Sequence, residues 1–433
     1  MVAFGIPMPI MLAWLFVLGA VIGSFLNVCI YRIPQKQGFW ASLVGLGSPP
    51  SSCPNCCNRI PWHDNIPILG WIKLRGRCRF CSKPISFRYP TIELLNGCLF
   101  AFVYWLEIPG NYGASIAESI VYDRTWAASL PIPFWLSPSA IVHCRYFYHM
   151  VLFEALVVAT FIDIDLRIIP DGVTLPAMLV GFCGAAIGQM YIVPLWFQDS
   201  SVMRSAKSVF PEWTHGFLSG PALPDWFASY PVLHGLAVSL AGFIVGGASI
   251  WLVRLIGAHV LRQEAMGFGD VILMAMIGSF IGWQPVLIVF FLAPACAMAV
   301  HMIKWLIWRQ RELPFGPYLS LATLIVVLDF QYVWAVSERV FAMGPLLIPV
   351  MLLMTVFMFV TLYAMQGIKR LLGIPLYPTD EIEEWTSADQ LHHYSGETND
   401  MHQGQWRPHA GDDWPGVQSG RGVAYNEQWR RGP

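Results

Sequence analysis

The chain has 433 residues, of which 56% belong to the hydrophobic set AVILMFWYC and 12% are charged, and its mean hydropathy is +0.53. Soluble domains carry about 25% charged residues, so this composition excludes an ordinary soluble enzyme. The 26 basic side chains nearly balance the 27 acidic ones, and the net charge of -1 therefore indicates no nucleic-acid partner. The sequence predicts an all-α polytopic membrane protein, with the lipid bilayer as its main surroundings.

Nine apolar segments are candidates for transmembrane helices, each of which needs roughly 20 apolar residues. They lie at about 8–30, 91–107, 146–162, 173–194, 231–256, 271–283, 285–306, 315–333 and 344–366. Segment 271–283 is short for a span, so residues 271–306 alternatively form one re-entrant piece and one helix. We expect about 8–9 transmembrane helices in total.

Five parts of the chain follow from this division. They are a first transmembrane helix (1–30), a cytoplasmic loop domain (31–90), a membrane core (91–333), an additional transmembrane helix (344–366) and a polar tail (378–433). The tail holds ten acidic residues and four arginines, and it cannot bury enough apolar surface to fold alone. We therefore expect the tail to be solvated and disordered.

The orientation in the membrane follows from the charges of the loops. Residues 31–90 carry nine basic side chains and one acidic side chain, that of Asp64. Such an excess of positive charge marks a cytoplasmic loop. The chain then starts outside, and the later loops alternate between the two sides. Segments 163–172, 254–270 and 307–314 are expected in the cytoplasm, and segments 108–145 and 195–230 outside.

Four cysteines of the basic loop have the spacing of a metal site. Cys53 and Cys56 form one CxxC pair, and Cys78 and Cys81 form a second pair after 21 intervening residues. This spacing is typical of a tetrahedral zinc site with four thiolate ligands. Redox thiols or two disulfides are the alternatives, although a reducing cytoplasm disfavours stable disulfides. Four protein ligands leave no open position, so the zinc would be structural. Cys57, next to Cys56, is interpreted as a bystander that does not bind the metal.

The sequence FIDIDLRIIPDGVTLP places three carboxylates where an apolar segment reaches the cytoplasm. These are Asp163, Asp165 and Asp171. Carboxylates at membrane depth are costly and are functional candidates, while the alternative is that they are interface charges paired with Arg167. Residues i and i+2 point apart on a helix, so Asp163 and Asp165 cannot share a face. Asp163 lies deepest in the apolar segment and is the better catalytic candidate, although Asp165 stays open.

A second aspartate motif, MGFGD, contains Gly267, Gly269 and Asp270. Glycines before the carboxylate allow a second chain or a substrate to approach closely. The motif lacks the remaining features of a phosphate-binding loop. The topology places Asp163 and Asp270 on the same side of the membrane. Two converging carboxylates have pKa values that are pushed apart, which suits aspartyl proteolysis with one ionised and one protonated group.

Six segments together resemble the type IV prepilin peptidase family, also called prepilin leader peptidase/N-methyltransferase. They are GSFLNVCIYRIP, the CPNC and CRFC pairs, FRYPTIELLNG, FIDIDLRIIPD, MGFGDVILMAMIGSFIGW and LPFGPYLSLA, in the order of the family. Three features depart from the family pattern. Ile272 stands where the family commonly has lysine, the ninth span and polar tail are additional, and the external loops are long.

The resemblance implies a membrane aspartic peptidase of the bacterial inner membrane with its active site facing the cytoplasm. Its substrates would be type IV prepilins or pseudopilins, which it would cleave after the leader. It would then methylate the new N-terminal amine with S-adenosylmethionine. By the same resemblance, Asp163 and Asp270 are catalytic, and the four cysteines hold zinc.

Three other functions remain compatible with these residues. A secondary transporter also uses membrane aspartates, as proton or ion relays. A membrane scaffold with a zinc-binding loop would need the cysteines but not the aspartates. A peptidase that lacks the methyltransferase activity would need the aspartates alone.

Overall fold

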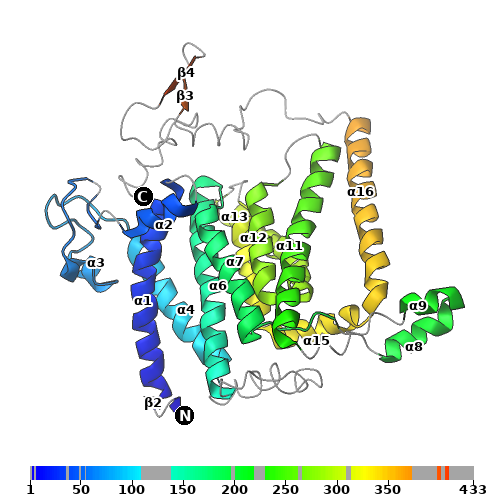
Figure 1. Ribbon diagram of the computed structural model, residues 1–433. Coiled ribbons are helices and arrows are strands. Elements are labelled where there is room, and N and C mark those ends of the chain that lie inside the picture. Colours follow the sequence, from blue (N-terminus) through cyan, green and yellow to red (C-terminus); the bar gives the residue numbers. More distant parts are fainter. Residues whose placement is uncertain are drawn as a thin grey trace. The chain divides into compact units, whose positions relative to one another are not determined.

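The computed structural model describes most of the apolar segments of the chain. The described residues are 2–3, 6–35, 39–47, 50–53, 55–108, 138–196, 200–218, 230–261, 266–308, 314–372, 397–400 and 405–408. Two short antiparallel strand pairs occur among them, β1 (Val2–Ala3) with β2 (Ile6–Pro7) and β3 (Glu397–Asp400) with β4 (Gln405–Pro408). Helices make up the other regular elements (Figure 1), which confirms the all-α class.

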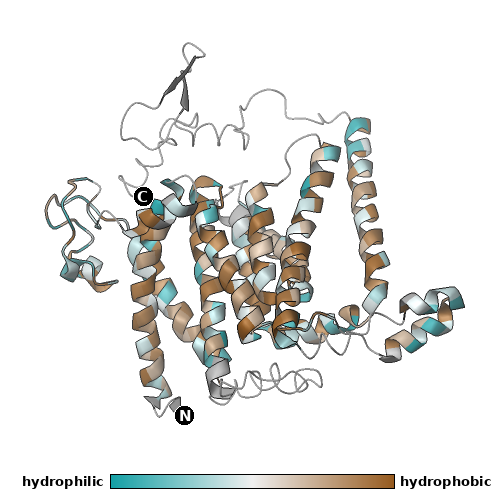
Figure 2. Cartoon of the chain, viewed as in Figure 1, coloured by the Kyte–Doolittle hydropathy of each residue, from teal (hydrophilic) through white to brown (hydrophobic). Residues whose placement is uncertain are grey.

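Six helices of the described residues are long and apolar enough to cross a membrane. They are α1 (Met8–Arg32), α6 (Pro138–Leu166), α7 (Asp171–Gly188), α11 (Pro231–Leu261), α13 (Trp283–Trp308) and α16 (Leu347–Leu371). Hydrophobic residues dominate along these helices in Figure 2. The number rises to seven if α14 (Gly316–Leu328) and α15 (Phe330–Phe341), bent by 94°, form one broken span.

The expected 8–9 spans are therefore more than the described residues provide, for three physical reasons. Segment 91–107 forms helix α4 (Arg88–Glu107), but Glu93, Asn96 and Glu107 reduce its apolar character. Segment 271–283 forms α12 (Phe268–Ile281), whose 14 residues reach only about 21 Å at 1.5 Å per residue, against a hydrocarbon thickness of about 30 Å. Segment 315–333 is interrupted at Asp329, where α14 ends.

Several short elements complete the described residues. They are η1 (Ile33–Gln35), α2 (Phe39–Gly47), η2 (Trp62–Asp64), α3 (Leu69–Lys73), α8 (Ser200–Val209), η4 (Glu212–Thr214), α9 (His215–Leu218) and η5 (Gly344–Leu346). Most of the predicted external loop 108–145 and of the predicted tail lies outside the described residues, as do parts of segments 195–230, 254–270 and 307–314.

The chain divides into two compact units, and two of the boundaries between them fall within α6 and α7. The first unit comprises residues 1–110, 157–175 and 384–433, and the second comprises residues 111–156 and 176–383. In the first unit α1 packs along α4 (Figure 1). A Cβ atom at Gly19 would lie 2.7 Å from Asn96 O, and one at Gly97 would lie 2.9 Å from Phe16 O. These small residues let the two backbones approach closely, as is common between membrane helices.

The core of the second unit is the short helix α12, which packs against α11, α13 and α14. Every residue from Leu273 to Ile281 is buried. A Cβ atom at Gly242 of α11 would lie 2.0 Å from Gly278 O of α12, so their backbones are in direct contact. The Tyr148 hydroxyl donates to Phe280 O at 3.1 Å and fixes the far end of the helix. Neighbouring helices therefore surround α12, and it does not have to match the bilayer thickness by itself.

Candidate metal centre and catalytic residues

The four predicted cysteine ligands lie together in the first unit. Their Sγ atoms are all within 4.8 Å of one another, with Cys53 and Cys81 3.8 Å apart and Cys56 and Cys78 4.0 Å apart. A tetrahedral zinc ion with bonds of about 2.3 Å requires sulfur–sulfur distances of about 3.8 Å. Disulfide bonds need about 2.05 Å, and these cysteines are free. The donor set and its geometry therefore fit a four-coordinate metal ion.

Two copies of one turn build this centre. In the first turn Cys57 N donates to Cys53 O at 2.9 Å, and in the second Ser82 N donates to Cys78 O at 3.0 Å. Cys57 and Ser82 both have a positive φ, 55° and 56°. The fifth cysteine thus occupies the position that serine takes in the second turn. It is exposed and outside the four-sulfur group, in agreement with its interpretation as a bystander.

The protein alone does not ionise the four thiols equally. Burial raises the pKa of Cys53 to about 12. Burial also opposes ionisation of Cys78, but hydrogen bonds from the backbone of Cys81 and Phe80 outweigh it and lower that pKa to about 7. A metal ion that binds four thiolates must therefore displace protons.

Asp64, the only acid of the basic loop, stabilises the fold around the cysteines. Its carboxylate is buried and accepts hydrogen bonds of 2.5 Å from Nε and Nη2 of Arg79. Lys73 Nζ lies 3.7 Å away. The Arg79 guanidinium holds the pKa of Asp64 below its usual range. The charge of this arginine is thus directed to Asp64.

The three aspartates at the end of α6 and the start of α7 have different surroundings. Asp163 is buried, with 6% of its surface exposed, and Asp171 is exposed in the first turn of α7. The Asp165 carboxylate forms a two-point pair with Arg88, at 2.7 Å and 2.6 Å. Arg88 also lies 5.1 Å from the ring centre of Phe161. The ion pair of Asp165 is therefore formed with Arg88 of α4, and not with Arg167 as the sequence suggested.

In the second unit Asp270 lies in the first turn of α12, and 9% of its surface is exposed. Gly267 is the N-cap of that helix. A Cβ atom there would lie 3.8 Å from Asp270 Oδ2, which is an ordinary van der Waals contact. Arg254 of α11 donates from Nε to Met266 O at 3.1 Å and lies 5.7 Å from the ring centre of Phe268. Sequence reasoning missed this arginine, since only its place at the end of an apolar segment could have drawn attention to it.

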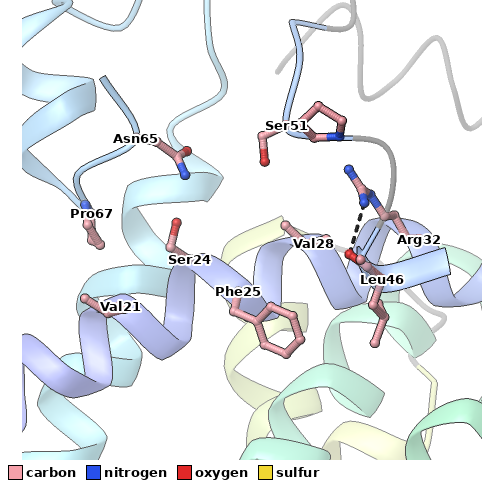
Figure 3. Close-up of a pocket in the computed structure, with 11 residues that line it drawn as sticks. Val21, Ser24, Phe25, Val28, Arg32, Leu46, Ser51, Asn65 and Pro67 are labelled. Carbon is pink, nitrogen blue, oxygen red and sulfur yellow. Dashed lines mark hydrogen bonds between the residues drawn. The ribbon is translucent and has the colours of Figure 1, made fainter. Parts of the chain in front are cut away.

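A pocket of about 350 Å³ lies beside the cysteine loop in the first unit. Residues of α1, the end of α2 and the loop line it, among them Ser24, Phe25, Arg32, Ser51 and Asn65. In the view of Figure 3, Asn65 and Pro67 lie toward one end, and Arg32 and Leu46 toward the other. This pocket could not be predicted from the sequence, because three separate segments form it.

Comparisons with known proteins relate the two units to one family. Residues 17–106 match the bacterial peptidase A24 N-terminal domain, and residues 225–303 match the type IV leader peptidase family. A prepilin leader peptidase/N-methyltransferase from Aeromonas hydrophila is 30% identical over 333 residues, which are 72% of this chain and 89% of that protein. One from Klebsiella pneumoniae is 30% identical over 63% of this chain and 86% of its own length. One from Myxococcus xanthus is 32% identical over 64% of this chain, which spans 58% of that protein.

No solved structure matches the chain significantly. The helices and the four-cysteine centre define a multi-pass membrane protein with a cysteine-rich loop near its N-terminus. The chain belongs to the type IV leader peptidase family, peptidase A24, which confirms the resemblance drawn from its motifs. The matched segments contain the four cysteines and Asp270, and Asp163 lies between them.

Proposed function

We propose that this protein is a prepilin leader peptidase and N-methyltransferase. It removes the leader from type IV prepilins or pseudopilins and methylates the amine that cleavage exposes. The observation that carries this proposal is the buried carboxylate of Asp270, held in the first turn of a buried helix within the segment that matches the peptidase family. The names of the similar proteins from Aeromonas hydrophila and Klebsiella pneumoniae support both activities.

Asp163 and Asp270 form the catalytic pair in this proposal. One ionised carboxylate takes a proton from water, which attacks the carbonyl carbon of the scissile peptide bond. The other, protonated carboxyl group donates its proton to the carbonyl oxygen. The carboxyl group that took the proton from water then gives it to the leaving amine, and the proton on the oxygen of the tetrahedral intermediate returns to the other carboxylate as the intermediate collapses. Burial of both side chains supports this assignment, because a carboxylic acid stays protonated near neutral pH only where water is restricted.

Asp163, and not Asp165, is the partner of Asp270. Arg88 binds both carboxylate oxygens of Asp165, and such a two-point pair fixes the side chain. Asp165 is therefore suited to hold the end of α6 against the start of α4. The supporting residues Asp171, Gly267 and Gly269 have no direct chemical role in this proposal.

The four cysteines hold a structural zinc ion. The sulfur–sulfur distances support this choice of metal, as does the all-thiolate donor set. Zinc stabilises a loop that is too small and too polar to fold by burial alone. The four cysteines fill its tetrahedral coordination, so the ion takes no part in hydrolysis.

The active site lies at the cytoplasmic face of the inner membrane. The nine basic residues of the loop 31–90 support this orientation. Arg88 at the start of α4 binds Asp165 near the end of α6, so the end of α6 that carries Asp163 lies at the side of the basic loop. A membrane-anchored prepilin would present its cleavage site at this depth.

The test is an intact-mass assay with the purified protein, a prepilin from the same organism and S-adenosylmethionine. The wild-type product should lose the leader and gain one methyl group. Asp163→Asn and Asp270→Asn should leave prepilin uncleaved, while the exposed control Asp171→Asn should cleave it. Asp165→Asn should retain measurable cleavage because its role is to hold the helix end.

Three results of this assay would contradict the proposal. Full cleavage by Asp270→Asn would rule out Asp163 and Asp270 as the catalytic pair. Cleavage by Asp163→Asn together with its loss in Asp165→Asn would assign the second role to Asp165. An inactive wild-type protein beside an active relative would favour a transporter or a scaffold.

A further inference from the structure

Residues 200–218 of the second unit form a hairpin in which α8 packs against α9. Helix α8 is amphipathic, with apolar side chains along one side and polar side chains along the other. The apolar side consists of Val202, Met203, Ala206 and Val209, and the polar side includes Arg204, Ser205, Lys207 and Ser208. Met203 of α8 and Leu218 of α9 are buried, so these two side chains serve the packing of the protein itself.

Three bulky apolar side chains at the turn of the hairpin are exposed, and together they form its apolar tip. They are Val209, Phe210 and Trp213, which are 80%, 44% and 85% exposed. The backbone between them is ordered, because Phe210 N donates to Ala206 O and His215 Nε2 donates to Phe210 O, both at 3.0 Å. A folded segment that holds a group of large apolar side chains outward marks an interaction surface.

The hairpin lies at the level where a membrane helix begins. With α14 along the bilayer normal, the 94° bend between α14 and α15 places α15 close to the plane of the membrane. The short helix η5 then connects α15 to α16, which starts at Leu347, and α9 packs against η5. Figure 1 shows α8 and α9 at the same end of the helices as α15. The apolar tip is therefore at the height of a membrane surface.

The side chains of α15 indicate the same level, because they form three sets that point in different directions at about 3.6 residues per turn. The buried set consists of Phe330, Trp334 and Phe341. The exposed apolar set, at intervals of four residues, consists of Tyr332, Val336 and Val340. The exposed polar set includes Gln331, Glu338 and Arg339. One side toward protein, one apolar side and one polar side are what a helix at the boundary between lipid and water requires.

We propose that the apolar tip inserts into the interfacial layer of the phospholipid bilayer and anchors the hairpin to the membrane. Tryptophan is enriched at this layer, since its ring is amphipathic, and Phe210 and Val209 suit the apolar boundary beneath the headgroups. Arg204 lies on the polar side of α8, where a guanidinium can bind lipid phosphates. This interaction depends on the membrane position of the second unit and on neither of the two proposed activities.

An anchor at this place has a physical use for α16. The most apolar window of α16 is 6% buried, whereas the windows of the other five candidate spans in the described residues are 28–56% buried. Packing against the bundle therefore does little to fix the depth of α16. Interfacial anchors set the position of such a helix, and the contact between α9 and η5 connects the anchored hairpin to the residues just before Leu347.

The experiment measures cysteine labelling of the full chain in nanodiscs of phosphatidylethanolamine and phosphatidylglycerol that hold one chain each. Val209→Cys tests the apolar tip, and Ser208→Cys is the matched control, because these neighbouring side chains are both exposed in the structure but lie on different sides of α8. A water-soluble maleimide should react with Val209→Cys at least about tenfold more slowly than with Ser208→Cys, since interfacial helices bury their apolar side about 5–10 Å deep. Peptide mass spectrometry separates the new thiols from the native cysteines.

Two controls keep the comparison interpretable. The two thiols should react at equal rates once the chain is denatured, and both variants should unfold at the Tm of the wild type. Trp213→Cys provides a second tip position, also slow to react in nanodiscs, if Val209→Cys fails to fold.

Three results would overturn the proposal. Equal, fast labelling of the tip and control thiols in nanodiscs would place the apolar tip in water. Equal, slow labelling of both would show that the whole hairpin is covered. Slow labelling of Val209→Cys that occurs only in nanodiscs holding two chains would assign the tip to a second copy of the protein in place of lipid.

Discussion

The contact between α11 and α12 should decide whether the helix that carries Asp270 is held in position. Replacing Gly242 by alanine adds a Cβ atom 2.0 Å from Gly278 O, 2.8 Å from Gly278 C and 2.8 Å from the Cα atom of Gly282. Real Cβ atoms essentially never approach other heavy atoms within 3.0 Å. The two helices must therefore separate by about 1 Å at this point, because both partners are backbone and no side chain can rotate away.

The cost follows from this geometry. Overpacking of a tight core costs about 1–3 kcal/mol and occasionally more, and a backbone contact without a movable side chain belongs at the upper end. For a unit of this size, each kcal/mol lowers Tm by about 2–4 °C, so Gly242→Ala should lower it by about 6–12 °C. Because α12 also begins with the turn of Asp270, prepilin cleavage should fall more steeply than the amount of folded protein.

Gly247→Ala is the matched control on the same helix. A Cβ atom there would meet the Cβ atom of Ala275 at 3.3 Å, which a shift of a few tenths of an ångström relieves. Thermal unfolding of both variants in detergent, followed by tryptophan fluorescence, would be combined with the cleavage assay. Wild-type Tm and wild-type cleavage in Gly242→Ala would refute the close contact, and equal losses in the two variants would refute its location.

Three further predictions concern the first unit. Arg88→Met leaves the partly buried Asp165 carboxylate unpaired and should lower the free energy of unfolding by about 2–3 kcal/mol, between the values for exposed and buried pairs. In thermal unfolding, the double variant with Asp165→Leu should recover part of this loss. Zinc analysis should find one ion per chain in the wild type and none in Cys78→Ser, whose loop should be cut faster in limited proteolysis. Because Arg79 lowers the folded-state pKa of Asp64, the stability that this ion pair gives the loop should be fully present above about pH 4 and lost as the pH falls below it. Arg79→Gln should weaken this acid sensitivity in the same proteolysis assay.

The parts of this structure that sequence reasoning predicted are those that depend on near neighbours in the chain. Each cysteine turn closes within five residues, so the spacing alone indicates the metal centre. The apolar segments predict helices because a membrane helix satisfies its own backbone hydrogen bonds. The division into basic and polar segments likewise needs no knowledge of tertiary contacts.

The parts that the sequence did not predict depend on distant contacts. Arg88 and Asp165 are 77 residues apart, and neither one indicates the other. Hydropathy detects that α12 is apolar, but not that surrounding helices bury it and thus permit its short length. For this reason, and because the bend at Asp329 leaves the apolar character of its segment unchanged, hydropathy indicates 8–9 spans where six or seven helices of the described residues meet the criteria of length and composition.

Arg254 shows how a side chain of a neighbouring helix can order the backbone of a sequence motif. The family commonly has a lysine two residues after the second aspartate, where this chain has Ile272. The guanidinium of Arg254 instead approaches the motif from α11, through Met266 O and the ring of Phe268. Both contacts precede Asp270 in the chain, so the arginine orders the backbone that leads into the first turn of α12. A basic group on the neighbouring helix can therefore hold the backbone that leads into this turn.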